Sequence, residues 1–329
     1  MTSGMNRRKF IGFAATLFPL SRQAGAQPDS VRRVGFLASG VQPAGGSLPA
    51  ALRKQLEDLG YTDGTTVVYD GRWSGGENER LPGLAAELVS RNVDVIVAFG
   101  SPAGEAAKRT TSTIPIVVFN AGDLVETRLV QSLGRPGGNV TGVNDPAATL
   151  SAKRLEILKE LVPLANRIAV LWNAENHAMT LRYHEIDRAA QAKGMTIDAL
   201  GVRHASDFDA AIAAMTRRPP DAMMMLTDAF TNLNRQRILD YVAAQRIPAM
   251  YEFAEVVRAG GLISYGSDQN EIFRLAAEYV AKVLRGAKAG DLPVEQPNRY
   301  FLVINLAAAK KIPLAVPQSL LVRADEVVQ

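Results

Sequence analysis

Short apolar segments typical of strands alternate with segments of helical periodicity along almost the whole chain, and this alternation constrains the fold more than any other feature. Residues 93–99 are almost wholly apolar, as in a parallel strand covered on both faces, whereas Leu48, Leu52, Leu56 and Leu59 recur at helical spacing. Such an alternation predicts an α/β protein whose parallel sheets carry helices on both faces.

The alternation divides into two stretches at the turn-rich residues 134–139. In the first stretch we expect strands at 34–38, 66–69, 93–99 and 116–119, and helices at 48–59, 81–88 and 102–110. In the second we expect strands at 168–172, 196–200, 222–226, 248–251 and 300–304, and helices at 150–162, 208–215, 235–245 and 272–284. At 329 residues the chain is long for a single core, so we predict two doubly wound parallel-sheet lobes with a cleft between them.

The first 26 residues have the pattern of an export signal. Arg7, Arg8 and Lys9 form a basic region, residues 10–20 form an apolar stretch, and a small-x-small site predicts cleavage after Ala26. The apolar stretch is too short to cross a bilayer as a helix, which needs about 20 residues. The paired arginines also resemble a twin-arginine signal, which leaves the export route open. We expect a periplasmic mature chain if the cell has two membranes.

The positive charge of the chain belongs to this leader. The formal net charge is +4, but four of the 37 basic residues lie in the first 26, and the other 33 equal the 33 acidic residues in number. A neutral body gives no electrostatic reason to expect nucleic acid as a partner. The chain has no cysteine, which excludes disulfides, thiol catalysis and a lipid-modified N-terminal cysteine.

No cofactor or metal site is expected from the motifs. The sequence has no phosphate-binding G-x-x-x-x-G-K-[ST] motif, and its glycines do not have dinucleotide-binding spacing. His177, His184 and His204 are too few and too loosely spaced for a metal site.

Polar and small residues follow the predicted strands, at the edge where open parallel sheets bind ligands. Each one alone is more typical of a helix cap or a turn, but together they converge from two lobes on one cleft. The candidate ligand-binding residues are Ser39, Gly40, Ser101, Pro102, Ala103, Asn120 and Asp123 in the first lobe, and Asn173, Thr227, Asp228, Tyr251 and Glu252 in the second.

Ser101 permits two interpretations. With Pro102 at the first helical position it is expected to be an N-cap, and the helix start with the amides of Ala103 and Gly104 would favour a ligand carboxylate. A cationic group of the ligand would then need Asp228 or Glu252. The alternative is an exported serine hydrolase that uses Ser101, which requires one of the three histidines within hydrogen-bond reach.

Several segments resemble a known family across essentially the whole mature chain. They include SLGRPGGNVTG at 132–142, GGLISYG at 260–266, DLPVEQP at 291–297 and LVRADEV at 321–327. In order and spacing these segments are similar to ABC-transporter substrate-binding proteins related to the tryptophan/tyrosine uptake group. One segment departs from the family pattern, because Leu124 replaces a proline and Thr127-Arg128 precedes Leu129-Val130 where a glycine is usual, so tryptophan is not carried over as the ligand.

The resemblance implies a type I periplasmic-binding fold with three hinge crossings, no catalysis, a small-molecule ligand and an ABC permease in the inner membrane as partner. We expect a signal peptide at 1–26, a first lobe of 27–143 plus 263–292, and a second lobe of 144–262 plus 293–329. A monomer is expected. The ligand would be a small polar or aromatic, carboxylate-bearing and amino-acid-like metabolite. A transcription regulator can use the same fold, but the residues before the first strand form the signal, so no DNA-binding module is expected.

Overall fold

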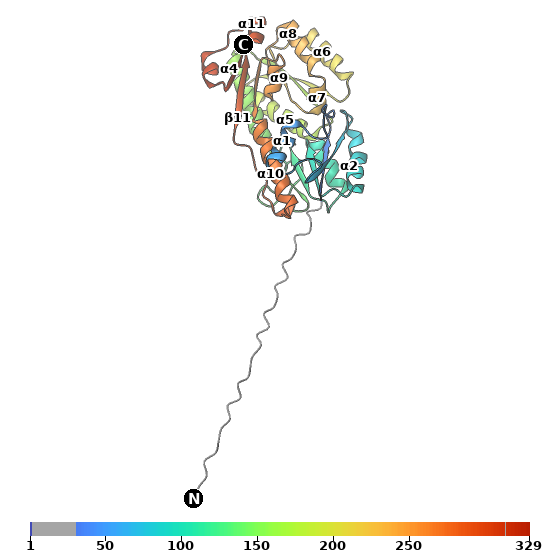
Figure 1. Ribbon diagram of the computed structural model, residues 1–329. Helices are drawn as coiled ribbons and strands as arrows, with labels where there is room; N and C mark the ends of the chain where they lie inside the picture. Colours follow the sequence, from blue (N-terminus) through green and yellow to red (C-terminus); the bar gives the residue numbers. More distant parts are fainter. Residues whose placement is uncertain (2–30, 313) are drawn as a thin grey trace. The chain divides into compact units, whose positions relative to one another are not determined.

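A computed structural model describes residues 1, 31–312 and 314–329 of the chain (Figure 1). The predicted signal peptide and its cleavage site lie outside the described residues, apart from Met1. Residues Val31–Gln329 form one compact unit that contains two β-sheets. The α/β class and the two lobes predicted from the sequence are confirmed.

The first lobe is built on five parallel strands in the order β2-β1-β3-β4-β5. These strands are β1 (Arg32–Ala38), β2 (Val67–Trp73), β3 (Val95–Phe99), β4 (Ile116–Phe119) and β5 (Val140–Gly142). The helices of this lobe are α1 (Ala50–Asp58), α2 (Leu81–Ser90), α3 (Ser101–Thr110) and α10 (Gln269–Leu284), with short 3-10 helices η1 (Asn78–Arg80) and η2 (Ala289–Asp291).

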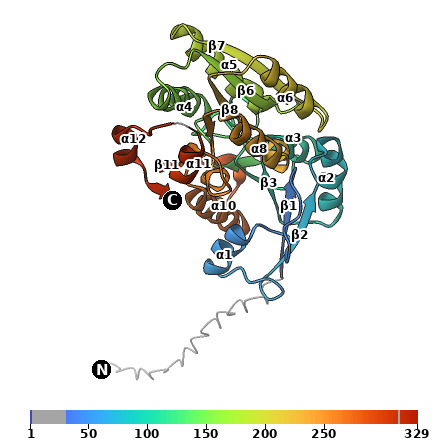
Figure 2. The same cartoon turned by 90° about the horizontal axis from the view of Figure 1, so that it is seen from above.

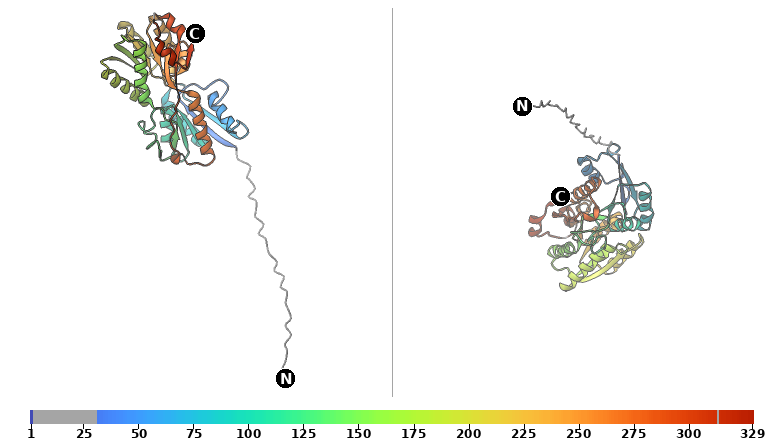
Figure 3. Two further views of the ribbon diagram at one scale, coloured as in Figure 1. Left: turned by 90° about the vertical axis from the view of Figure 1, so that its left-hand side faces the viewer. Right: turned by 90° about the horizontal axis from the view of Figure 1, so that it is seen from below.

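Alternate side chains of β1 point to opposite faces of this sheet, as the period of two in a strand requires. Phe36 packs in one core with Leu52 of α1 and Ile272 of α10, whereas Leu37 packs in another with Leu88 of α2 and Ala107 of α3. In Figure 2, α1 and α10 accordingly lie on one side of β1 and β3, and α2 lies on the other. Figure 3 shows the same association of α10 with the N-terminal half of the chain.

The second lobe is built on seven strands in the order β12-β11-β10-β9-β8-β6-β7. These strands are β6 (Arg167–Asn173), β7 (Thr196–Val202), β8 (Ala222–Met225), β9 (Ala249–Tyr251), β10 (Ile263–Ser267), β11 (Tyr300–Asn305) and β12 (Glu326–Val328). The helices are α4 (Ala147–Leu161), α5 (His177–Ala192), α6 (Asp207–Arg217), α7 (Ala229–Leu233), α8 (Arg235–Gln245), α9 (Ala254–Arg258), α11 (Leu306–Lys311) and α12 (Gln318–Arg323).

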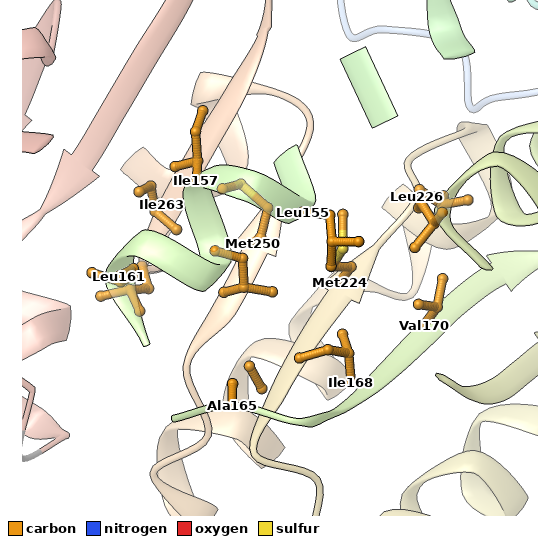
Figure 4. Packing of buried hydrophobic residues seen from close by; sticks show 14 of the residues in the cluster. Leu155, Ile157, Leu161, Ala165, Ile168, Val170, Met224, Leu226, Met250 and Ile263 are labelled. Carbon is orange, nitrogen blue, oxygen red and sulfur yellow. The ribbon is translucent and has the colours of Figure 1, made fainter. Parts of the chain in front are cut away.

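This second sheet also has a core on each face. Ile168, Val170 and Met224 pack with residues of α4 and α5 such as Leu155 (Figure 4). The opposite face packs against α6, α8 and α9, and Leu171 is part of that core. The sheet is not wholly parallel as predicted, because β10 and β11 pair antiparallel. The chain enters β11 directly from the first lobe, so no helical crossover within the lobe is needed.

Three segments connect the lobes. The first follows β5 and the third precedes β11, and they run side by side, since the Asn144 amide donates to the Glu295 carbonyl at 2.8 Å. The second follows β10, where the Asp268 amide donates to the Arg299 carbonyl at 3.0 Å. The expectation that the first lobe resumes at residue 263 is wrong, because residues 263–267 form β10 inside the second sheet, paired with β9 and β11.

Helix α5 was not among the predicted helices. Its inward-facing residues include Ala178, Arg182, Ile186 and Ala190, spaced four residues apart. The arginine interrupts the apolar pattern that identifies such helices in a sequence. Among the described residues, no helix is long and apolar enough to cross a membrane.

Candidate functional site

A pocket of about 290 Å³ lies between the carboxyl edges of the two sheets. From the first lobe it is lined by Ser39, Phe99, Gly100, Ser101, Pro102, Asn120, Ala121, Gln269 and Phe273. From the second lobe it is lined by Asn176, Met179, Thr227, Asp228, Ala229, Asn232, Phe253, Glu255 and Val256. The pocket thus forms where parallel strands end, as the sequence predicted.

Aromatic rings form one wall of this pocket. Phe99 and Phe273 line it, and Phe119 lies between them in edge-to-face contact, with ring centroids 5.1 Å from Phe99 and 5.8 Å from Phe273. Such packing fixes the rings, because edge-to-face pairs stabilise a definite orientation. Phe253 and Met179 add apolar surface from the second lobe. The wall therefore suits an apolar or aromatic part of a ligand.

Four polar side chains of the lining carry a buried atom that has no hydrogen-bond partner within the described part of the chain. They are the hydroxyls of Ser39 and Thr227, the Oδ1 atom of Asn120 and the Nε2 atom of Gln269. Asn120 and Gln269 also bond each other, Nδ2 to Oε1, at 2.8 Å. A buried polar atom without a partner costs free energy, so these atoms are suited to bonding a polar ligand or water.

Asp228 is held at the pocket by neutral donors. Its Oδ2 atom accepts from Asn173 Nδ2 at 2.7 Å and from Asn176 Nδ2 at 3.0 Å, and its Oδ1 atom accepts from the Thr231 amide at 3.0 Å. Glu255 is the other acid of the lining, and no Lys, Arg or His is among the described residues that line the pocket. The carboxylate of Asp228 therefore faces the pocket without a cation from the lining to balance it.

The start of α3 faces the same pocket from the first lobe. The predicted N-cap at Ser101 is wrong by one residue: Gly100 caps α3 with a φ of 89°, a conformation that glycine adopts without strain. The Ser101 hydroxyl instead donates to Glu105 Oε1 at 3.0 Å, and the Gly104 amide donates to the Gly100 carbonyl. The Gly104 amide is thus not available to a ligand, but the positive end of the helix dipole still lies at the pocket.

Six of the twelve candidate residues line the pocket, namely Ser39, Ser101, Pro102, Asn120, Thr227 and Asp228. The other six do not. Gly40 lies beside the lobe boundary, Ala103 packs in the core of the first lobe, and Tyr251 packs in the core of the second. The Asp123 carboxylate accepts from the amides of Val125 and Glu126, so it caps its own turn.

Asn173 and Glu252 support the site from behind instead of lining it. Asn173 positions Asp228, as described above, while Glu252 is 1% exposed and receives three hydrogen bonds. These come from Arg154 Nη1 and Arg182 Nη1, both at 2.8 Å to Oε1, and from the Thr227 amide at 2.7 Å to Oε2. The expectation that Glu252 pairs with a cationic group of the ligand is therefore wrong, because two arginines already neutralise it.

The Arg154, Arg182, Glu252 and Asp145 side chains form one buried ion-pair network. Arg182 donates to Asp145 Oδ2 at 2.6 Å, and Asp145 lies on the first crossing between the lobes. Burial by itself raises the pKa of Glu252, but Arg182, Arg154 and the Thr227 amide outweigh that effect and hold the pKa below its usual range. Sequence reasoning missed both arginines, although each takes a core-facing helix position, Arg154 on α4 and Arg182 on α5.

Within the described residues no histidine bonds Ser101, as the hydrolase alternative requires. Ser101 is buried and pairs with Glu105, whereas His177, His184 and His204 are exposed. In the same part of the chain no group of three or more His, Asp or Glu side chains could hold a metal ion.

Comparisons with known proteins agree with this geometry. The family model for the ABC transporter substrate binding protein matches residues 45–328. A tyrosine-binding protein of Clostridioides difficile is 28% identical over 261 residues, which cover 79% of this chain and 75% of that protein. A conserved domain protein of Vibrio cholerae has a crystal structure similar to this chain, with a TM-score of 0.84, 26% identity and coverage of 91% of this chain and all of that one.

A further solved structure is that of an ABC domain from Streptococcus pneumoniae in complex with L-Trp. Its TM-score is 0.83 at 24% identity, with coverage of 91% of this chain and 100% of that one. Proteins of the matched family bind solutes and are not enzymes, so the hydrolase alternative is wrong. The sheets, the pocket between them and a family match over most of its length together show that this chain belongs to the ABC transporter substrate binding protein family.

Proposed function

We propose that this chain is the exported receptor of an ABC importer and that it captures a small amino-acid-like metabolite between its lobes. The observation that carries the proposal is the polarity of the pocket. An acidic side chain, Asp228, faces it from the second lobe, and the positive end of α3 faces it from the first. A zwitterionic ligand would satisfy both ends.

In this proposal the amine of the ligand lies near Asp228, and its carboxylate lies near Ser39 and Ser101 at the start of α3. The apolar part of the ligand packs against Phe99 and Phe273. The names of the relatives support an amino acid, since one is a tyrosine-binding protein and another was crystallised with L-Trp.

Export and delivery complete the proposal. Cleavage after Ala26 would release the mature chain into the periplasm, where it acts as a monomer and presents the closed, ligand-bound form to a permease in the inner membrane. The basic and apolar leader supports export, and substrate-binding proteins of ABC importers are typically exported.

The proposal is tested by binding to the mature chain. A thermal-shift screen of the twenty amino acids and their deaminated analogues identifies ligands, since a ligand at 100 times its Kd adds about 2.7 kcal/mol of stability. Calorimetry with Asp228→Asn then tests the amine site. Asparagine is also a good N-cap, so α7 can keep its cap, while the charge and the acceptor toward Asn173 and Asn176 are lost together.

We expect Asp228→Asn to weaken binding at least 30-fold, the lower end of the cost of removing one partner of a buried charge pair, about 2 kcal/mol. Asp240→Asn is the matched control, because Asp240 is exposed on α8 and bonds only Gln236 among the described residues. Binding by Asp228→Asn within threefold of the parent would show that Asp228 does not hold an amine.

A further inference from the structure

The short helix α7 joins the pocket to a contact between the lobes. Ala229 and Asn232 of α7 line the pocket. A Cβ atom built on Gly76, in the loop after β2, would lie 3.1 Å from Leu233 Cδ1 and 4.0 Å from Phe230 Cδ2. Two residues of α7 therefore rest against a loop of the opposite lobe, and a side chain in place of Gly76 would press on Leu233.

A second contact joins α7 to the loop after β1. A Cβ atom on Gly40, in the loop after β1, would lie 4.0 Å from the Cβ atom of Ala229. The two loops are themselves tied together, because the Gly75 amide donates to the Gly40 carbonyl at 2.9 Å and the Gly76 amide donates to the Ser39 carbonyl at 2.6 Å. The first lobe thus presents one glycine-containing surface to α7, and Ser39 of the pocket is part of it.

Asp228 connects α7 to the pocket, because it lines the pocket and also caps this helix. It caps the helix in a reciprocal arrangement with Thr231, and the Thr231 hydroxyl also donates to the Leu226 carbonyl at 3.0 Å. A ligand group that binds Asp228 therefore touches the residue that orients Phe230 and Leu233 toward the first lobe.

We propose that α7 is a latch: its seating on Gly40 and Gly76 stabilises the closed lobes, and the part formed by Phe230, Leu233 and Gly76 adds to ligand affinity although these residues do not line the pocket. The latch rests on the proposed function, since it requires a ligand held between the lobes. Leu233 is 42% exposed even with the lobes in contact, and separating the lobes would expose more of it. Apparent affinity falls in proportion to the fraction of binding-competent protein, so a weaker latch weakens binding.

Leu233→Ser tests the latch. We expect a Kd about 3-fold to 10-fold higher with an unchanged order of preference among ligands, and an increase mainly in the dissociation rate. Leu164→Ser is the matched control, because Leu164 is 93% exposed and lies on the loop after α4 in the second lobe. An unchanged Kd for Leu233→Ser would contradict the latch.

A disulfide tests the contact without depending on affinity. The chain has no cysteine, so the double variant Gly40→Cys with Ala229→Cys carries only the two new thiols. The 4.0 Å between the two Cβ positions lies within the range of disulfides, about 3.5–4.5 Å. We expect oxidation to form this bond, faster with ligand present, and the bond to slow ligand release at least tenfold until it is reduced.

Failure of the proposed function and failure of the latch would give different results. A parent chain that binds no amino acid overturns the proposed function, and disulfide formation can still be scored in the double variant by electrophoresis. A parent that binds ligand, together with a double variant that stays reduced under oxidising conditions, overturns the latch alone. The single variants Gly40→Cys and Ala229→Cys show what each thiol does to binding by itself.

Discussion

Replacing Glu252 by glutamine should destabilise the folded chain by about 3–5 kcal/mol, the usual cost of removing one partner of a buried ion pair. The carboxylate is 1% exposed and accepts hydrogen bonds from Arg154, Arg182 and the Thr227 amide. Glutamine keeps the shape of the side chain but not its charge. Asp145 would then be the one carboxylate left in the network for two buried arginines. Among the described residues its side chain bonds Arg182 and not Arg154, so Arg154 would lose its ionic partner.

The loss of stability translates into a measurable shift of the melting temperature. Unfolding entropies of about 2.1 cal/mol/K per residue give about 0.6 kcal/mol/K for a body of this size, so Tm should fall by about 5–8 °C. Scanning calorimetry of the mature chain at neutral pH measures the shift directly.

Glu255→Gln is the control for the chemical change. Glu255 is exposed at the pocket rim, and among the described residues it pairs with Arg258, whose Nη1 atom is 3.9 Å away. The Tm of Glu255→Gln should therefore stay within about 1 °C of the parent. A fall of less than about 2 °C for Glu252→Gln would refute the reasoning, since it would mean that the two arginines do not depend on this carboxylate.

Three other outcomes follow from the structure and the sequence. The pKa of Glu252 is lowered on folding, so the charged side chain contributes stability above its unfolded pKa of about 4.3. This contribution is lost as the pH falls through the lower folded pKa. Melts at pH 7 and pH 3 should therefore show the Tm of the parent approaching that of Glu252→Gln in acid. Gly142→Ala should cost about 1–3 kcal/mol or prevent folding, because a β-carbon there would overlap the Val118 carbonyl oxygen at a φ of 148°, and denaturant titration measures this cost. N-terminal sequencing of the exported protein should begin at Gln27, and retention of residues 10–20 would contradict cleavage after Ala26.

Much of the fold could be predicted because hydrophobic periodicity and turn residues are local properties of the sequence. The run at residues 93–99 became β3, and the leucines at helical spacing became α1. Helix α5 was missed for a physical reason, because Arg182 occupies a position where an apolar residue normally marks the buried face.

The site could be predicted only as far as strand ends reveal it. Asn120 and Asp228 follow strands, and both line the pocket. Gln269 and Phe273 line it too, but they lie on α10, which returns to the first lobe almost 150 residues after Asn120. No local pattern indicates such a return.

Glu252 shows the limit of the same reasoning. It follows β9 and so lies at the expected edge of the sheet, but Arg154 and Arg182 reach it from α4 and α5. The end of a strand fixes the backbone position of a residue, but the partners of its side chain depend on helices packed elsewhere in the chain. The sequence left Asp228 and Glu252 as equal candidates, and the packing separates them.

The most direct test of solute capture between the lobes is isothermal titration of the mature chain with the twenty amino acids and their deaminated analogues. We expect an apolar or aromatic amino acid to bind at one molecule per chain, because Phe99 and Phe273 line one wall of the pocket. Its deaminated analogue should bind at least 30-fold more weakly, because Asp228 would lose its cation. Equal binding of the two, or no binding by any amino acid, would contradict an amino-acid receptor.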